Sequence, residues 1–454
     1  MKRQLTALAA MAFLLAASLP LSGCKDNGDS SSPSSAVSGM DSTPSSGTSN
    51  SGFPDGERWT PNEFIISTLV GIPSGANDAQ NDRAVKYHKE ANFNMIELCN
   101  FSDKEMLLAL ETCKKYGVSA LPSDISFTDP NVTEEQIKER MKFYEPYADT
   151  IRGFLIRDEP AYDTELYQLL RERADLVRSL APTKLMFMNL FPSYGNYTWA
   201  SETGDGNDSQ FAKYCNDFFA ATDPDVLSVD HYVFFNNEAC IANLSVNDLW
   251  RDWGFFRKRS IETGKPFWCY IQSLGVFMHD KGIGGMTPEK IAFQLNSAIA
   301  YGVKGISYYN SLASVIDERA YKTELFDGVK EANRQALLFG NYLLNKDYGK
   351  LYHTSMLEKA EKHYYTDKLS ESDLLAALPD NALVSTFTDD TARTYLMIVN
   401  RSYEAAMEGT IVLKDTKPIG MLDTASGEEL AVSASADRIA VSLPAGGAAL
   451  YMIG

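Results

Sequence analysis

The chain has 454 residues, a formal net charge of -18 at pH 7 and 44% hydrophobic residues. Its length allows one large domain and a smaller second domain, each with a core of its own. The negative charge excludes nucleic acid and anionic lipid as the main ligand, because both are bound by basic surfaces that release counterions.

The N-terminal segment has the layout of a cleavable export signal. Met1-Lys2-Arg3 precedes an apolar run from Leu5 to Leu21, and Ser22-Gly23-Cys24 follows it. Residues 1–23 are therefore predicted to be a signal peptide. The small residues before Cys24 resemble the lipobox of bacterial lipoproteins, which implies that its thiol is acylated. We expect an exported, extracytoplasmic protein that is lipid-anchored to a bacterial membrane. The alternative is a plain apolar helix, for which the next residues offer no packing partner.

Residues 24–57 are predicted to be a flexible tether. From Asp26 to Gly56 the chain consists mostly of Ser, Gly, Asp, Thr, Pro and Asn. Such a segment cannot bury enough apolar surface to offset its ordering entropy. The folded part is therefore expected to lie off the membrane surface without entering it.

Residues 58–345 alternate short apolar runs with longer amphipathic stretches, which indicates βα units around a parallel sheet. Eight such units predict closure into a (β/α)8 TIM barrel, and an open doubly wound sheet is the alternative. The eight candidate strands are Phe64–Val70, Met95–Cys99, Ser119–Pro122, Gly153–Ile156, Leu185–Asn189, Val226–Val229, Phe267–Ile271 and Gly305–Tyr309.

Several helix ends can be predicted within this region. Thr287-Pro288-Glu289 has a capping Thr, a Pro at the first helical position and an acid near the positive end of the helix dipole. Gly117, Gly264 and Gly302 each precede a candidate strand. We expect all three glycines to end helices in the left-handed conformation.

Residues 346–454 read as a small C-terminal antiparallel β-sandwich domain, because short alternating strands follow one another beyond Asn381. This domain is predicted either to pack against the barrel or to bind sugar. Its candidate strands are Leu383–Phe387, Arg393–Val399, Gly409–Leu413, Arg438–Leu443 and Ala448–Ile453.

The cysteines and histidines give no sign of a metal or redox site. Besides Cys24, the cysteines are widely spaced and include no CxxC pair, so we expect mostly buried thiols and at most one or two disulfides. The histidines form no HExxH pattern, and there is no Walker sequence and no GxGxxG after a strand. We therefore expect no cofactor and no metal.

Acidic residues follow two of the predicted strands, where a barrel of this type has its site. Asp158 and Glu159 come after the fourth strand, and Asp230 comes after the sixth. Glycosidic hydrolysis needs one protonated carboxyl group to assist the leaving oxygen and one ionised group to attack or to activate water. Burial and the like charge of Asp158 should both raise the pKa of Glu159, as a general acid requires. We predict Glu159 as general acid/base and Asp230 as nucleophile or base, with Asp158 beside them.

These acids also have structural interpretations. Asp158 and Glu159 could cap the following helix and pair with Arg157, since strand-to-helix turns are rich in such acids. Asp230 could orient the ring of His231 or cap a loop. The sequence leaves both alternatives open.

Further residues near the strand ends are predicted to contact substrate, because aromatic faces with polar tips suit sugar rings. The predicted substrate-binding residues are Asp124, Asn189, His231, Tyr232, Trp268, Gln272, Tyr309 and Asn310. The aromatic residues near the rim are Tyr162, Phe191, Tyr194, Tyr197, Trp199, Tyr232, Phe234, Trp268, Tyr308 and Tyr309. We expect about three of these aromatic residues to touch ligand and many of the others to be core.

Three segments carry a resemblance to a known group of enzymes. They are Gly153-Phe-Leu-Ile-Arg-Asp-Glu-Pro160, Lys265-Pro-Phe-Trp-Cys-Tyr-Ile-Gln272, and the stretch from Phe293-Gln294 through Ala300-Tyr-Gly302 to Gly305-Ile-Ser-Tyr-Tyr309. Residues 60 to about 340 resemble the clan of retaining glycoside hydrolases built on a (β/α)8 barrel, most nearly the branch containing family 42 β-galactosidases. In that clan an Asn-Glu pair ends strand four and its Glu is the acid/base. The resemblance implies that role for Glu159, with Asp158 in place of the Asn.

The chain departs from this clan at its nucleophile, which is a Glu ending strand seven. The matching position here is Ile271, and its side chain cannot attack an anomeric carbon. Asp230 could supply the second carboxylate, with retention expected at a carboxyl separation of about 5 to 5.5 Å and inversion at about 6.5 to 9.5 Å. Alternatively, Asp158 and Glu159 act with an unidentified residue, or the protein binds glycan without catalysis.

The sequence thus predicts a glycoside hydrolase that acts on extracytoplasmic oligo- or polysaccharide. The alternative is a carbohydrate-binding lipoprotein that has lost its nucleophile. Expected partners are the carbohydrate, a membrane reached through the lipid anchor only, and other polysaccharide-utilisation proteins, with no nucleic acid.

Overall fold

The computed structural model describes residues 52–194, 207–234, 246–273, 285–312, 314–354 and 365–454. Residues 49–454 form one compact unit. The predicted signal peptide, Cys24, Cys240, Tyr197 and Trp199 lie outside the described residues. Within the described ranges, no helix has both the length and the apolar character that crossing a bilayer requires.

The first part of the folded unit alternates strands and helices, as predicted. The strands are β1 (Ile65–Thr68), β2 (Met95–Leu98), β3 (Ser119–Pro122), β4 (Gly153–Asp158), β5 (Leu185–Asn189), β6 (Leu227–Asp230), β7 (Phe267–Ile271) and β8 (Gly305–Tyr308). The helices are α2 (Asp78–Glu90), α3 (Asp103–Tyr116), α4 (Glu134–Tyr144), α5 (Thr164–Leu180), α6 (Asn207–Thr222), α7 (Val246–Thr263), α8 (Pro288–Ala300) and α9 (Phe326–Tyr342), with short 3-10 turns at Ile125–Phe127 and Glu145–Tyr147.

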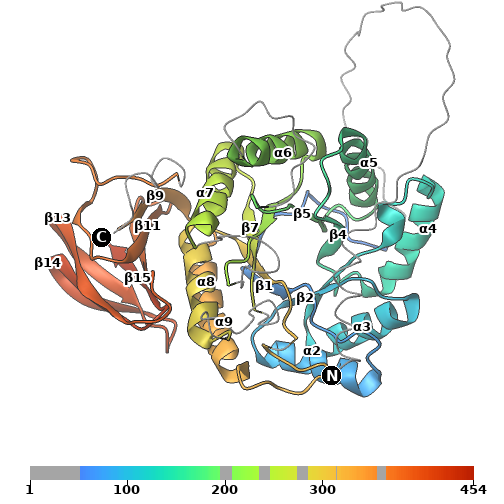
Figure 1. The fold of residues 1–454 in the computed structure, drawn as a ribbon, viewed down its shortest axis with the longest axis horizontal. Coiled ribbons are helices and arrows are strands. Elements are labelled where there is room, and N and C mark those ends of the chain that lie inside the picture. Colours follow the sequence, from blue (N-terminus) through green and yellow to red (C-terminus); the bar gives the residue numbers. More distant parts are fainter. Residues whose placement is uncertain (1–51, 195–206, 235–245, 274–284, 313, 355–364) are drawn as a thin grey trace, which may run out of the picture. The chain divides into compact units, whose positions relative to one another are not determined.

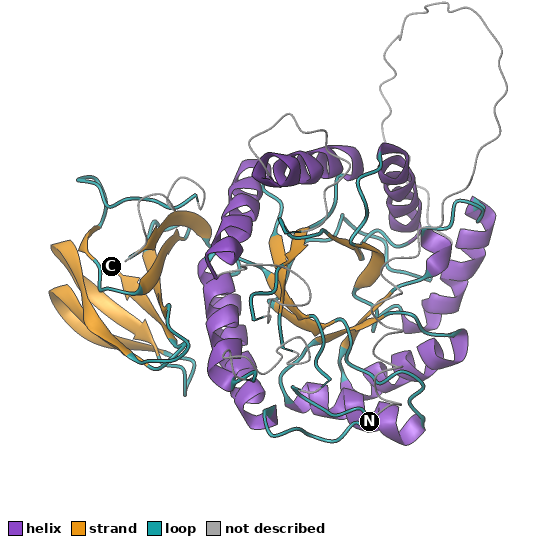
Figure 2. Cartoon of the chain, viewed as in Figure 1, coloured by secondary structure: helices purple, strands orange, loops and turns teal. Residues whose placement is uncertain are grey.

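Hydrogen bonds join these parallel strands in chain order. The order β1-β8-β7-β6 forms one sheet, and β2 with β3 and β4 with β5 form two pairs. Single parallel bridges connect Ser123 to Leu155 and Leu190 to Val229. Asn94 links β2 to β1, because its backbone N–H donates to the Ile66 oxygen at 3.1 Å. Figures 1 and 2 show the resulting ring of strands surrounded by helices.

Side chains alternate between the two faces of the strands. On β7, Phe267, Cys269 and Ile271 belong to the core cluster shared with the helices, whereas Trp268 and Tyr270 belong to the cluster inside the ring. A strand with both faces covered reads as a nearly continuous apolar run, which is why the strand positions could be predicted closely.

The predicted helix ends are confirmed. Thr287 caps α8 by accepting a hydrogen bond from the Lys290 backbone N–H at 3.3 Å. Gly117, Gly264 and Gly302 have φ values of 62°, 70° and 88°. These positive angles favour glycine, which has no Cβ to clash with the following carbonyl.

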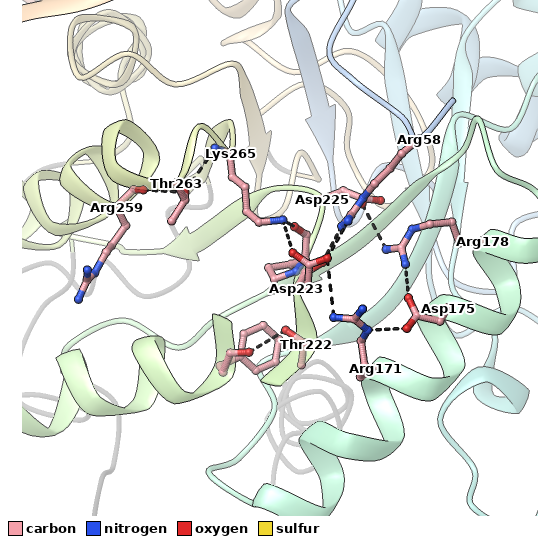
Figure 3. Close-up of polar contacts among 12 residues, drawn as sticks. Arg58, Arg171, Asp175, Arg178, Thr222, Asp223, Asp225, Arg259, Thr263 and Lys265 are labelled. Atoms are coloured by element: carbon pink, nitrogen blue, oxygen red, sulfur yellow. Dashed lines mark hydrogen bonds and ion pairs between the residues drawn. The ribbon is translucent and has the colours of Figure 1, made fainter. Parts of the chain in front are cut away.

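An ion-pair cluster ties the segment before β1 to the face of the ring where the strands begin (Figure 3). Arg58 pairs with Asp223 at 2.7 Å and also with Asp225, and both acids precede β6. Lys265, which precedes β7, pairs with Asp223 at 2.7 Å. The buried Asp225 also accepts the Met186 backbone N–H at 2.7 Å. The cluster is therefore an anchor at the face opposite to the strand ends.

The folded part begins before residue 58. Phe53 is 3% exposed and packs edge-to-face on Phe154, with the ring centroids 5.9 Å apart. The tether predicted to run to residue 57 is therefore too long at its C-terminal end, because a single aromatic side chain provides enough apolar surface to hold this segment on the core.

The C-terminal part is an antiparallel sheet. Its strands are β9 (Asp347–His353), β10 (Leu375–Ala377), β11 (Ala382–Thr388), β12 (Thr394–Asn400), β13 (Met407–Leu422), β14 (Glu429–Leu443) and β15 (Ala448–Ile453). They form one sheet, ordered β10-β13-β15-β12-β11-β9 with β14 beside β13, in place of the two packed sheets of the predicted sandwich. The long β13 contacts β10, β14 and β15 along a register that shifts repeatedly, so this strand bends within a single sheet.

The central strand β12 of this sheet is buried on both faces. On β12, Leu396 and Ile398 belong to a core formed only by the C-terminal strands, whereas Met397 and Val399 belong to the core shared with the helices. Packing against the first part of the chain is therefore one role of the sheet.

The cysteines also behave as predicted, since Cys99, Cys113, Cys215 and Cys269 are unpaired thiols.

Candidate active site

The backbone is irregular at the end of β4, where Asp158 and Glu159 lie. The pairing of β4 with β5 shifts register between Leu155 and Arg157, which is the mark of a β-bulge. Glu159 follows with a φ of 43°, in the left-handed region that a non-glycine residue adopts at a cost of about 1 kcal/mol or more. Its backbone N–H donates to the Asn189 oxygen at 2.9 Å. Strained backbone of this kind is frequent at functional sites.

The side chains of Glu159 and Asp230 lie within hydrogen-bonding reach of one another, and this interaction contributes to the pKa of both carboxyl groups. Burial, followed by the charges of Asp230 and Asp158, raises the pKa of Glu159 far above its ordinary range. Two carboxylates this close cannot both ionise cheaply, so Glu159 carries the proton at neutral pH.

Asp158 lies beside this pair and is fixed by β5. The side-chain amide of Asn189 donates to the Asp158 carboxylate at 3.1 Å, and the side-chain oxygen of Asn189 accepts from the Ser228 hydroxyl at 2.8 Å. Burial raises the pKa of Asp158, and burial followed by the charge of Asp158 raises the pKa of Asp230 to about 7. The structure therefore brings Asp158, Glu159, Asp230 and Asn189 together, as the sequence predicted.

Two of the structural roles considered for these acids belong to other residues. The cap of α5 is Asp163, whose side chain accepts from the Glu165 and Leu166 backbone N–H groups. The role of orienting the His231 ring belongs to Asp252 of α7, which accepts from Nδ1 at 2.6 Å. Asp230 is therefore not needed for that purpose.

The His231 ring is held in one orientation. The hydrogen bond between His231 and Asp252 is fully buried, the Asp252 carboxylate also accepts the Ser193 backbone N–H at 2.9 Å, and Tyr194 packs edge-to-face on the ring at 4.8 Å. Nε2 of His231 and one carboxylate oxygen of Asp230 are buried and have no hydrogen-bond partner among the described residues. Buried polar atoms normally have partners, so both atoms are candidates to contact a ligand.

Three tyrosines surround the carboxyl pair. Tyr232 donates a hydrogen bond to Asp230, and its ring lies 5.1 Å from that of Tyr309. The Tyr194 hydroxyl accepts the Tyr232 backbone N–H at 3.1 Å, and burial, followed by the charges of Asp230 and Glu159, raises its pKa. Burial, followed by the charges of Glu159 and Asp230, also raises the pKa of Tyr309. Tyr194, Tyr232 and Tyr309 are thus the rim aromatics that the structure brings to the acids.

Two predicted substrate-binding residues have other roles. Asp124 accepts hydrogen bonds from Ser126 at 2.7 Å, from Tyr144 at 2.6 Å and from Arg140, so its oxygens are occupied by the fold. Trp268 is 1% exposed and lies inside the ring against Trp59 and Phe187. It is the second residue of β7, so it lies toward the strand start, away from the site. The predictions for both residues are corrected accordingly.

Three residues at the ends of β7 and β8 have contacts within the fold. The Gln272 side chain accepts the Phe234 backbone N–H at 2.8 Å and donates to the Phe234 backbone oxygen at 2.9 Å. Asn310 accepts the Leu312 backbone N–H at 2.8 Å, which is a local turn contact. Ile271 is fully buried in the core shared with the helices, so its side chain does not line the site.

Glu97 of β2 was missed by the sequence analysis. It is 3% exposed inside the ring, where Ser67 donates to it at 3.0 Å, Tyr270 donates at 2.6 Å and Ser307 also donates. Burial, and more weakly the charge of Asp158, raises its pKa to about 7. The available signal was an acid in the middle of the apolar run Met95–Leu98.

Glu97 makes stability depend on pH. Its folded pKa of about 7 exceeds the ordinary value of 4.5, so its contribution is complete below pH 4.5 and is lost as the pH rises through 7. The difference in free energy of unfolding between Glu97→Gln and the unmodified protein should therefore shift by about 3 kcal/mol in favour of the variant between pH 4.5 and pH 8. Denaturant unfolding at both pH values measures this.

A matched control has the opposite sign. The pKa of Asp124 is lowered by hydrogen bonds from Tyr144, Ser126 and Arg140, which outweigh the effect of burial. Asp124→Asn should therefore destabilise most at pH 8 and least at acid pH. Parallel pH trends in the two variants would contradict the interpretation of Glu97 as a carboxyl that is buried with its proton.

Comparison with known proteins identifies no family. No family model matches the chain, and no curated protein is significantly similar to it. No group of three or more metal-ligating side chains is found among the described residues.

Several solved glycoside hydrolases are similar in fold to this chain. A glycoside hydrolase family 5 protein from Bacteroides vulgatus has 13% identity and a TM-score of 0.49, covering 87% of this chain and 91% of that chain. A GH27 β-L-arabinopyranosidase from Geobacillus stearothermophilus has 9% identity and a TM-score of 0.45, covering 87% and 97%. A glucosidase from Croceicoccus marinus has 12% identity and a TM-score of 0.39, covering 87% and 97%. At these levels the function has to be argued from the site itself.

Proposed function

We propose that this protein is a glycoside hydrolase with Glu159 as general acid/base and Asp230 as nucleophile. The observation that carries the proposal is the contact between these two carboxyl groups, one from the end of β4 and one from the end of β6. We further propose that β1 to β8 close into a (β/α)8 barrel that forms the catalytic domain, with residues 346–454 as the C-terminal domain. Active sites of such barrels lie at the strand ends.

The environments of the two acids suit different roles. Glu159 is kept protonated by burial and by its acidic neighbours, so it can donate its proton to the glycosidic oxygen as that bond breaks. Burial and the charge of Asp158 raise the pKa of Asp230 to about 7, and hydrogen bonds from Glu159 and Tyr232 offset part of that rise, so Asp230 ionises more readily than Glu159. The Asp230 carboxylate then bonds to the anomeric carbon. Water displaces it in the second step while Glu159 takes up the proton of that water.

Two of the tyrosines and His231 would bind the sugar. Tyr232 and Tyr309 present ring surface beside the acids, and Nε2 of His231 can accept a hydroxyl hydrogen because Asp252 holds the other ring nitrogen. The lipid anchor at Cys24 and action outside the cytoplasm remain part of this proposal, based on residues 1–24. So does the resemblance to the family 42 branch.

Stereochemistry follows from the carboxyl spacing. Retention requires a separation of about 5 to 5.5 Å and inversion about 6.5 to 9.5 Å. Carboxyl groups that start this close must move apart to admit an anomeric carbon. The retaining separation requires the smaller movement, so we expect retention. Proton NMR of the first-formed anomer, with a panel of aryl glycosides and polysaccharides, tests both activity and outcome. An inverted product would contradict the role of Asp230 as nucleophile, and saturable binding without turnover would favour a carbohydrate-binding protein.

A further inference from the structure

The chain segment after β6 is held from two sides. The backbone of Phe234, four residues after Asp230, donates to and accepts from the Gln272 side chain. The backbone N–H of Gln272 in turn donates to Gln294 of α8 at 2.9 Å, and the Gln294 amide donates back at 2.8 Å. The end of the segment that carries Asp230 and His231 is therefore fixed to β7 and α8.

The ring of Phe234 is covered by a residue of the C-terminal sheet. Phe234 is 1% exposed and packs edge-to-face on Tyr403, with centroids 5.2 Å apart and planes at 88°. Tyr403 also packs edge-to-face on Phe293 of α8 at 5.4 Å. Aromatic contacts of this geometry contribute about 0.5–1.5 kcal/mol each beyond the area that they bury. Tyr403 thus lies between the β6 segment and α8.

The turn that carries Tyr403 is rigid. The Asn400 amide donates to the Ala405 and Pro444 oxygens at 2.8 and 2.9 Å, and its own oxygen accepts the Ser402 backbone N–H at 2.9 Å. The turn is also tied to α8, because Asn296 donates to the Gly446 oxygen at 2.9 Å and Gly446 donates to Ser402 at 2.7 Å. A fixed turn can hold a ring in place, whereas a loose one could not.

We propose that Tyr403 is a positioning residue for the β6 strand end, so that the C-terminal sheet is part of the catalytic unit. Through Phe234, it fixes the backbone from which Asp230 and His231 project toward the partners described above. The catalytic interpretation rests on the proposed function, but the mechanical link does not. A displacement of about 1 Å at a reacting group can cost about 100-fold in rate, which is why such a support would matter.

The test compares three variants of the full chain. Tyr403→Ala removes the ring, Tyr403→Phe keeps it, and Tyr395→Ala removes a ring that packs on Tyr342 of α9 instead. Hydrogen–deuterium exchange of the Phe234 amide should accelerate about 10-fold or more in Tyr403→Ala and stay unchanged in the other two. The kcat for glycosides should fall about 10-fold in Tyr403→Ala alone, with a smaller change in KM.

The two measurements separate the two hypotheses. Faster exchange without any turnover in the unmodified protein would leave the positioning role standing and remove the proposed function. Unchanged exchange in Tyr403→Ala, or equal acceleration in Tyr395→Ala, would overturn the positioning role. Tyr403→Leu, which retains apolar volume, replaces the alanine variant if that variant does not fold.

Discussion

Glu159→Gln is expected to reduce kcat on unactivated glycosides by about 10²–10⁴-fold, because the amide cannot donate the proton that the leaving oxygen needs. The substitution preserves side-chain shape, so KM should change much less than kcat. Glycosides with strongly acidic aryl leaving groups need little protonation and should lose far less. Steady-state kinetics across leaving groups of increasing pKa therefore measures the acid role directly.

The pH profile provides a second readout of the same residue. Burial and the charges of Asp230 and Asp158 raise the pKa of Glu159, so the acid form should persist well above the ordinary range of a glutamate. The alkaline limb of kcat/KM in the unmodified protein should reflect this group. That limb should be absent in Glu159→Gln.

The exposed Glu165, in the first turn of α5, is a matched control. Glu165→Gln should leave both the rate and the pH profile unchanged. Equal losses on all leaving groups in Glu159→Gln would indicate a general disturbance of the site, and the assignment of Glu159 as the acid would then be wrong.

The parts of the site that could be predicted are those governed by local pattern. Asp158, Glu159, Asn189 and Asp230 were placed correctly because strands buried on both faces have clear ends, and parallel strands bring those ends together. The backbone angle of Glu159 could not be predicted, because nothing in Asp-Glu-Pro specifies a left-handed conformation.

The errors have a common physical origin. The predicted strand Phe267–Ile271 agrees with β7 and already puts Trp268 near the strand start, so its aromatic character was a weaker guide to the rim than its position in the strand. Asp252 lies 21 residues beyond His231 on another element, and only tertiary packing brings the two together. Glu97 lies inside β2, whereas the predicted acids follow strand ends, so the strand-end pattern could not indicate it.

Asp230→Asn is expected to abolish the first chemical step, with a loss of about 10²–10⁴-fold in kcat/KM, because an amide cannot form the bond to the anomeric carbon. The same change removes the neighbouring charge that contributes most to the raised pKa of Glu159. Carbon-13 NMR of labelled glutamate should therefore show the Glu159 carboxyl titrating at lower pH in Asp230→Asn than in the unmodified protein.

Asp158→Asn separates the two acids near Glu159. Asp158 is already engaged by Asn189, so its loss should lower the rate less than the loss of Asp230. The pKa of Glu159 should fall here too, but by a smaller amount, since the charge of Asp158 ranks below that of Asp230 among its causes. If Asp158→Asn removed activity while Asp230→Asn retained it, the second carboxylate would be Asp158, and the contact between Glu159 and Asp230 would serve only to hold the proton on Glu159.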